Sequence, residues 1–98
     1  MNSNYLVIHG SFGSPFINWF PWFYDELTKK DKQVLIPQFP IGLELQNYDN
    51  WKMLLDYYRD IGFLTNETIV FAHSIGAIFI VKYLLENNIK VNKLVLVS

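Results

Sequence analysis

Short apolar runs along the chain alternate with longer segments whose apolar residues recur at helical spacing. Within the runs, hydrophobic and polar residues barely alternate, which is typical of strands that are covered on both faces. In the clearest helical segment, 48–61, the side chains of Trp51, Leu54 and Leu55 share one face, and charged residues occupy the other. The pattern predicts strands at 5–9, 33–36, 67–73 and 93–97, and helices at 18–30, 48–61 and 75–86.

The alternation of strand and helix predicts an α/β fold: a parallel sheet of about four strands with helices on both faces, in three layers (α/β/α). Residues 1–98 are expected to belong to one domain, because no repeat, low-complexity tract or linker interrupts them. No helix follows the last predicted strand, at 93–97, so its outer backbone groups would lack partners. We therefore expect either a missing C-terminal part or self-association of two copies through this edge strand.

The segment Ala72-His73-Ser74-Ile75-Gly76 lies at the predicted junction between the third strand and the third helix. A serine in such a turn, with small residues two positions before and after it, is the pattern of a nucleophile elbow, which lifts a reactive hydroxyl clear of the backbone. Ala72 stands where the usual pattern has a first glycine. We expect positions 72 and 76 to crowd each other, which would require Gly76. An ordinary serine at a helix N-terminus is the alternative interpretation.

A serine nucleophile needs a base, and in the elbow arrangement the acid and the histidine follow the serine in the chain. The two histidines, His9 and His73, both precede Ser74. His73 is adjacent to Ser74 and is expected to point to the opposite face of the sheet, as a packing residue. We interpret His9 as a residue that supports the loop after the first strand rather than as the base. The chain is therefore expected to be the front part of a hydrolase, inactive alone, whose acid and base lie beyond Ser98.

Three segments together resemble the α/β-hydrolase fold, and more narrowly the small serine hydrolase family that includes retinoblastoma-binding protein 9. His9-Gly10-Ser11 is similar to the family's His-Gly loop, and residues 18–22 resemble its aromatic segment at the first helix. Residues 72–77 resemble its Gly-His-Ser-x-Gly elbow. The resemblance extends over nearly the whole chain but over only about the first half of a family member.

The resemblance implies roles for individual residues. Ser74 would be the nucleophile, and the backbone N–H of Ile75 would be one donor of an oxyanion hole. The second donor would be the N–H of Ser11 or Phe12, in the loop after the first strand. The residues that would support this loop and the elbow are His9, Gly10, His73 and Gly76.

The resulting functional hypothesis is a carboxylesterase-like serine hydrolase that cleaves a small ester or amide through an acyl-enzyme on Ser74. A non-catalytic protein-binding module on a hydrolase scaffold is the alternative, because a fold does not imply a function. An aromatic cluster near the first helix would either line an acyl pocket or pack in the core; it comprises Trp19, Phe20, Trp22 and Phe23.

Composition narrows the range of partners. The 98 residues are 51% hydrophobic and 17% aromatic, and they carry a formal net charge of −1 without a basic block, so neither nucleic acid nor an anionic membrane is expected as a partner. The absence of cysteine excludes disulfides and thiolate metal sites, and it fits a reducing compartment, the cytoplasm. Residues 1–4 suggest no signal peptide, and the spacing of His, Asp, Glu and Gly suggests neither a metal nor a cofactor. Four acidic residues are interpreted as solvated helix faces: Asp25, Glu26, Asp56 and Asp60.

Overall fold

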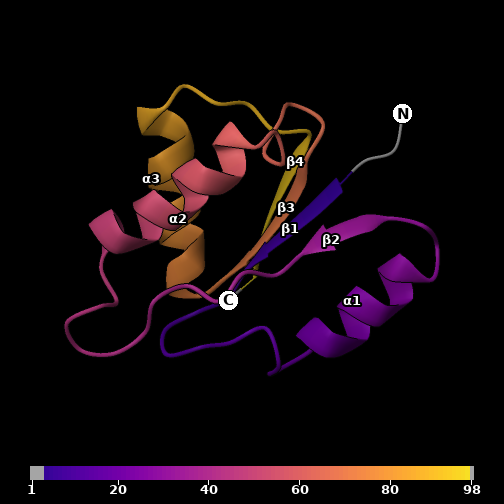
Figure 1. Cartoon of the computed structure of the whole chain (residues 1–98), viewed down its shortest axis with the longest axis horizontal. Helices are drawn as coiled ribbons and strands as arrows, with labels where there is room; N and C mark the ends of the chain where they lie inside the picture. The colour runs from indigo at the N-terminus through magenta and orange to yellow at the C-terminus, as the bar shows by residue number, and fades with distance from the viewer. Residues whose placement is uncertain (1–3, 98) are drawn as a thin grey trace.

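Figure 1 shows the computed structural model of the chain, which describes residues 4–97. Residues 1–3 and residue 98 lie outside the described part. The expectation about a signal peptide concerns residues 1–4 and therefore falls mostly outside it. Strands and helices follow one another in the predicted alternation. Their bounds are β1 (Asn4–Ile8), α1 (Phe20–Thr28), β2 (Gln33–Leu35), α2 (Tyr48–Asp60), β3 (Ile69–His73), α3 (Ile75–Glu86) and β4 (Lys93–Val97).

Helix α1 is shorter at both ends than the spacing of its apolar residues predicts. Asn18, before the helix, and Asp31, after it, have φ angles of 57° and 59°. A residue in this left-handed region cannot continue a right-handed helix, so α1 extends neither to Asn18 nor to Asp31 and spans Phe20–Thr28. The other elements begin and end within one or two residues of the predicted positions.

The four strands form one parallel sheet in the order β2-β1-β3-β4, which confirms the predicted α/β fold. Strand β1 lies inside the sheet, where Tyr5 pairs with Val34 of β2 on one side and with Ile69 of β3 on the other. After β2 the chain crosses to the far side of β1, so the strand order reverses between β1 and β3. In open parallel sheets, ligands bind at the carboxyl ends of the strands where this reversal occurs.

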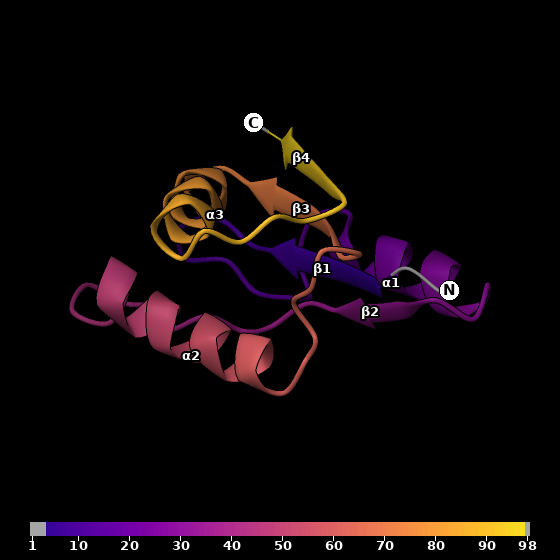
Figure 2. The same ribbon diagram turned by 90° about the horizontal axis from the view of Figure 1, so that it is seen from above.

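The sheet separates α1 from α2 and α3, as the two views in Figures 1 and 2 show. On one face, the ring of Phe23 in α1 lies 4.8 Å from the ring of Phe71 and 6.2 Å from that of Tyr5. On the other face, α2 and α3 cover the larger core. The three layers are those that the alternation predicts. The buried residues of the larger core are Leu6, Ile8, Phe39, Trp51, Leu55, Leu64, Val70, Ala72, Phe79, Ile80, Tyr83 and Leu84.

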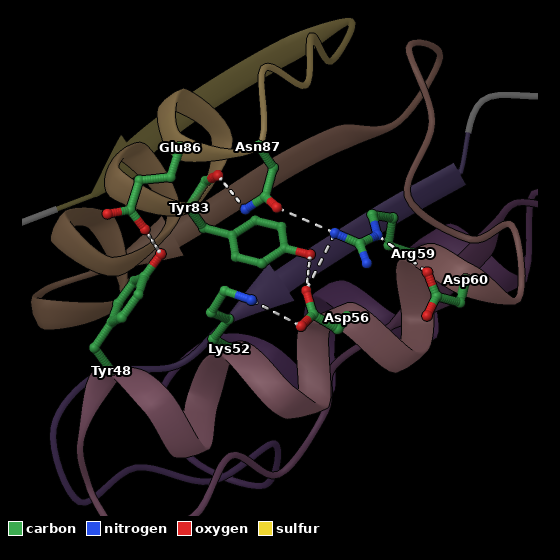
Figure 3. Close-up of polar contacts among 8 residues, drawn as sticks. All are labelled: Tyr48, Lys52, Asp56, Arg59, Asp60, Tyr83, Glu86 and Asn87. Carbon is green, nitrogen blue, oxygen red and sulfur yellow. Dashed lines mark hydrogen bonds and ion pairs between the residues drawn. The ribbon is translucent and has the colours of Figure 1, made fainter.

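Helices α2 and α3 are joined by a polar network around Asp56 (Figure 3). The Asp56 carboxylate accepts a hydrogen bond from the Tyr83 hydroxyl at 2.7 Å, and it pairs with Lys52 at 3.0 Å and with Arg59 at 3.2 Å. Burial alone would raise the pKa of Asp56, but the contacts with Tyr83 and Lys52 lower it overall. The interpretation of Asp56 as a solvated helix face is wrong, because α3 packs over it and leaves 26% of its side chain exposed.

Candidate active site

Ser74 forms the turn between β3 and α3. Its backbone has φ 57° and ψ −125°, a conformation that residues with a side chain rarely adopt. Its N–H donates to the carbonyl oxygen of Val97 at 3.0 Å, which ties the turn to β4. The residue is exposed, and its side chain makes no capping hydrogen bond to the first turn of α3. The Ser74 hydroxyl therefore lies at the surface, beside the N-terminus of a helix.

Gly76, in the first turn of α3, lies against the end of β1. A Cβ atom at this position would be 2.5 Å from the carbonyl oxygen of His9 and 2.9 Å from Cγ2 of Ile8. The three nearest atoms all belong to Ile8 and His9, so the expected crowding against Ala72 is not what requires a glycine. Position 76 requires a glycine because α3 starts directly over the backbone of β1.

The loop after β1 packs directly against Ser74. A Cβ atom at Gly10 would lie 3.0 Å from Cβ of Ser74 and 3.1 Å from Nδ1 of His73. The N–H of Gly13 donates to the carbonyl oxygen of Gly10 at 3.1 Å and closes a tight turn. The loop and the Ser74 turn are therefore neighbours at the carboxyl ends of β1 and β3, where the strand order reverses.

His9 is fully buried beneath this loop. Its Nε2 accepts a hydrogen bond from the N–H of Phe39 at 2.9 Å, which leaves Nδ1 to donate to the carbonyl oxygen of Gly10 at 2.8 Å. Burial lowers the pKa of His9, although the two hydrogen bonds oppose this effect. A neutral imidazole with both nitrogens engaged can hold the loop in place but has no free nitrogen to take a proton from Ser74.

His73 lies on the face of the sheet that α1 covers. The centre of its ring is 6.3 Å from that of Phe20, a fully buried residue of α1. The side chain therefore packs under α1, next to the site in sequence but directed away from the core beneath α3. Within residues 4–97, neither histidine forms a hydrogen bond with Ser74.

Gln46 belongs to the site, although no sequence pattern singled it out. Its Nε2 donates to Oγ of Ser11 at 2.8 Å, and its Oε1 accepts from the N–H of Phe12 at 2.6 Å. Phe12 itself has a positive φ of 52°. Gln46 therefore ties the loop after β1 to the segment before α2. It also accepts a hydrogen bond from the N–H of Phe12, one of the two candidates, with Ser11, for the second donor of the oxyanion hole.

Comparison with known proteins identifies the family. A family model described as serine hydrolase matches residues 5–98. The chain belongs to the serine hydrolase family. A search of curated proteins finds no match to this serine hydrolase sequence.

Two solved structures share the fold of this serine hydrolase chain. The ydeN gene product from B. subtilis is 25% identical with a TM-score of 0.82, and an extracellular α/β-hydrolase from a Paenibacillus species is 19% identical with a TM-score of 0.73. The Paenibacillus protein is described as sharing structural and functional homology with tobacco salicylic acid binding protein 2. Each comparison covers 98% of this chain but only 50% and 40%, respectively, of the solved chains. The serine hydrolase segment therefore spans half of their length or less.

The aromatic cluster of this serine hydrolase segment lies apart from the site. Phe20 is fully buried, Trp19 and Phe23 pack against the sheet, and Trp22 is 64% exposed on the outer side of α1. None of these four residues lines the cavity that lies next to Ile75. Three of the four residues pack in the layer between α1 and the sheet, as the core interpretation of the cluster predicts.

Two structural features are absent from residues 4–97. No group of three or more His, Asp or Glu side chains in this range is placed to hold a metal ion. No helix of the same range is both long and apolar enough to cross a bilayer.

The burial of His9 predicts that this serine hydrolase segment loses stability as the pH falls. The pKa of His9 is lower in the folded state than its ordinary value of 6.5. On acidification the unfolded state therefore binds a proton first, so the free energy of unfolding is constant above about pH 6.5 and decreases below it. For one proton the slope is at most ~1.4 kcal/mol per pH unit. Urea denaturation followed by circular dichroism between about pH 7.5 and 5.5 measures it.

The other histidine provides the matched control. His9→Gln should remove this slope, whatever its effect on the absolute stability, and His73→Gln should retain it. If the slope survives in His9→Gln and disappears in His73→Gln, the assignment to His9 is wrong.

Proposed function

We propose that Ser74 is the nucleophile of a serine hydrolase that cleaves small esters or amides through an acyl-enzyme. The observation that carries the proposal is the backbone of Ser74, with φ 57° and ψ −125° in a turn that leads from β3 directly into α3. A serine held in this way, with an exposed side chain, supports the assignment of the turn as a nucleophile elbow, the strand-to-helix turn of α/β-hydrolases. Glycine would adopt the same conformation at lower cost, so a serine here has to be explained by its hydroxyl.

The proposed oxyanion hole consists of two backbone N–H groups near Ser74. Ile75 is the first residue of α3, so its N–H has no partner within the helix and lies at the positive end of the helix dipole. For the second donor we favour Ser11 over Phe12, because the Phe12 N–H already donates to Gln46 at 2.6 Å. Preorganised donors act on the charge that develops in the transition state, and the loss of one costs roughly 2.7–4 kcal/mol.

The mechanism also needs a base and an acid. As Oγ of Ser74 attacks the substrate carbonyl, a histidine takes the hydroxyl proton and a tetrahedral oxyanion forms. Collapse of this intermediate expels the alcohol or amine, which receives that proton, and water then releases the acid from the acyl-enzyme. Because the chain spans half or less of the matched solved structures, we propose that sequence outside these 98 residues supplies the histidine and its acidic partner.

Labelling by a fluorophosphonate, which reacts with activated serines, tests this proposal on the longest polypeptide that the gene encodes. We expect a label on Ser74 that is lost in Ser74→Ala and retained in Ser14→Ala, a control serine in the loop after β1. The 98-residue chain alone should remain unlabelled. Labelling that survives Ser74→Ala, or no labelling of the longest polypeptide, contradicts the proposal and favours a non-catalytic protein-binding module.

A further inference from the structure

A cavity of about 270 Å³ lies between the N-terminal parts of α2 and α3. The proposed mechanism does not use this cavity. Its lining residues are Gln46, Asn47, Tyr48, Trp51, Ile75, Ile78, Phe79 and Lys82.

The cavity adjoins the proposed site at two points. Ile75, which immediately follows Ser74, contributes to its wall. Gln46 also contributes to its wall, and the same side chain is hydrogen-bonded to Ser11 and Phe12 in the loop after β1. The carbon chain of an acyl group attached to Ser74 would therefore begin one residue away from the cavity wall.

The polar groups of the cavity wall already have partners within the protein. The indole N–H of Trp51 donates to a backbone carbonyl at 2.7 Å, and the Tyr48 hydroxyl donates to Glu86. The side chain of Asn47 caps α2, and the ammonium group of Lys82 lies 4.1 Å from the centre of the Tyr48 ring. What the wall offers to a ligand is consequently mainly aromatic and aliphatic surface, which suits an apolar group, with the Lys82 ammonium as its one charged group.

The size of the cavity narrows the class of ligand. A cavity of about 150 Å³ lined by apolar side chains is known to hold benzene, so about 270 Å³ accommodates an aromatic ring with a short alkyl chain. Trp51 and Phe79, whose ring centres are 5.4 Å apart, contribute aromatic surface to the wall although only 3% and 6% of them is exposed. The half-buried ring of Tyr48 is a third aromatic group of the wall, and an aromatic guest can make edge and stacking contacts with these rings. We infer that the cavity binds the acyl part of the substrate and that this part is a neutral arylalkyl group, an inference that rests on the proposed role of Ser74.

The experiment is a titration of the ¹⁵N-labelled chain with 4-phenylbutanamide, a neutral amide that carries such an acyl group, observed at the indole N–H signals. We expect the Trp51 signal to shift with a Kd of roughly 2 mM, the affinity typical of a ligand of this size. Trp19 and Trp22, on the other side of the sheet, serve as internal controls and should not shift.

Two variants of α3 locate the binding site. Ile78 and Leu85 are similarly exposed, at 71% and 77%, but only Ile78 lines the cavity. Ile78→Trp should raise the Kd of the probe by about tenfold or more. Leu85→Trp should change the Kd by about twofold at most. Unchanged dispersion of the amide signals verifies that both variants are folded.

The outcomes separate this inference from the proposed function. If the Trp51 signal does not shift, or if Ile78→Trp binds as well as Leu85→Trp, the inference is overturned while fluorophosphonate labelling of Ser74 is unaffected. If the probe binds at Trp51 but Ser74 is never labelled in the longest polypeptide, the cavity is a ligand site without an acyl role, and the inference as stated is also overturned.

Discussion

Gly76→Ala is expected to lower the free energy of unfolding by about 3 kcal/mol, the upper end of the usual cost of overpacking. The added Cβ would lie 2.5 Å from the carbonyl oxygen of His9, a backbone atom that cannot rotate away as a flexible side chain could. At an ordinary helical position, the same substitution stabilises by about 1 kcal/mol, because alanine has the higher helix propensity. A urea titration followed by far-ultraviolet circular dichroism therefore determines both the size and the sign of the effect.

The double variant Ala72→Gly/Gly76→Ala tests which neighbour imposes this requirement. If Ala72 and position 76 crowded each other, removing the methyl group of Ala72 would restore stability to Gly76→Ala. Because the nearest atoms belong to Ile8 and His9, we expect no recovery and a double variant at least as unstable as Gly76→Ala. A double variant that regains wild-type stability would show that the contact with β1 is not the limiting one.

The strands, the helices and their parallel arrangement could be predicted because their signals are local. Helix α3 begins and ends at the predicted residues, Ile75–Glu86, since a largely apolar segment follows the Ser74 turn and two asparagines close it. The bounds of α1 were less accurate because they depend on the left-handed backbone of Asn18 and Asp31. The spacing of apolar residues contains no information about the φ of such flanking residues.

The position of Ser74 could be predicted, but most contacts around it could not. Gln46 and Ser11 are 35 residues apart, and Asp56 and Tyr83 are 27 residues apart. Whether such pairs meet depends on how α2 docks against the sheet and α3, which no local pattern specifies. The same reason explains why the requirement for Gly76 was attributed to a neighbour in sequence instead of to β1.

Ser74→Gly is expected to be more stable than Ser74→Ala by about 1–2 kcal/mol. The conformation of residue 74, with φ 57° and ψ −125°, costs a residue with a side chain about 1–3 kcal/mol. Glycine avoids this strain but loses about 0.5–1 kcal/mol through the greater freedom of its unfolded chain. Both variants lack the hydroxyl, so the difference between their free energies of unfolding in urea reports the backbone alone.

Ala77→Gly, in the first turn of α3, is the control for the intrinsic effect of glycine, and it should destabilise by about 1 kcal/mol. If Ser74→Gly lost as much stability as Ala77→Gly, the turn would not be strained, and the main support for Ser74 as a nucleophile would be gone. If Ser74→Gly raised the free energy of unfolding while Ala77→Gly lowered it, the chain would retain a serine at a position where glycine makes the fold more stable. A hydroxyl kept at such a cost is most simply explained by its reactivity, because stability lost at a single strained residue is characteristic of sites that act on a ligand.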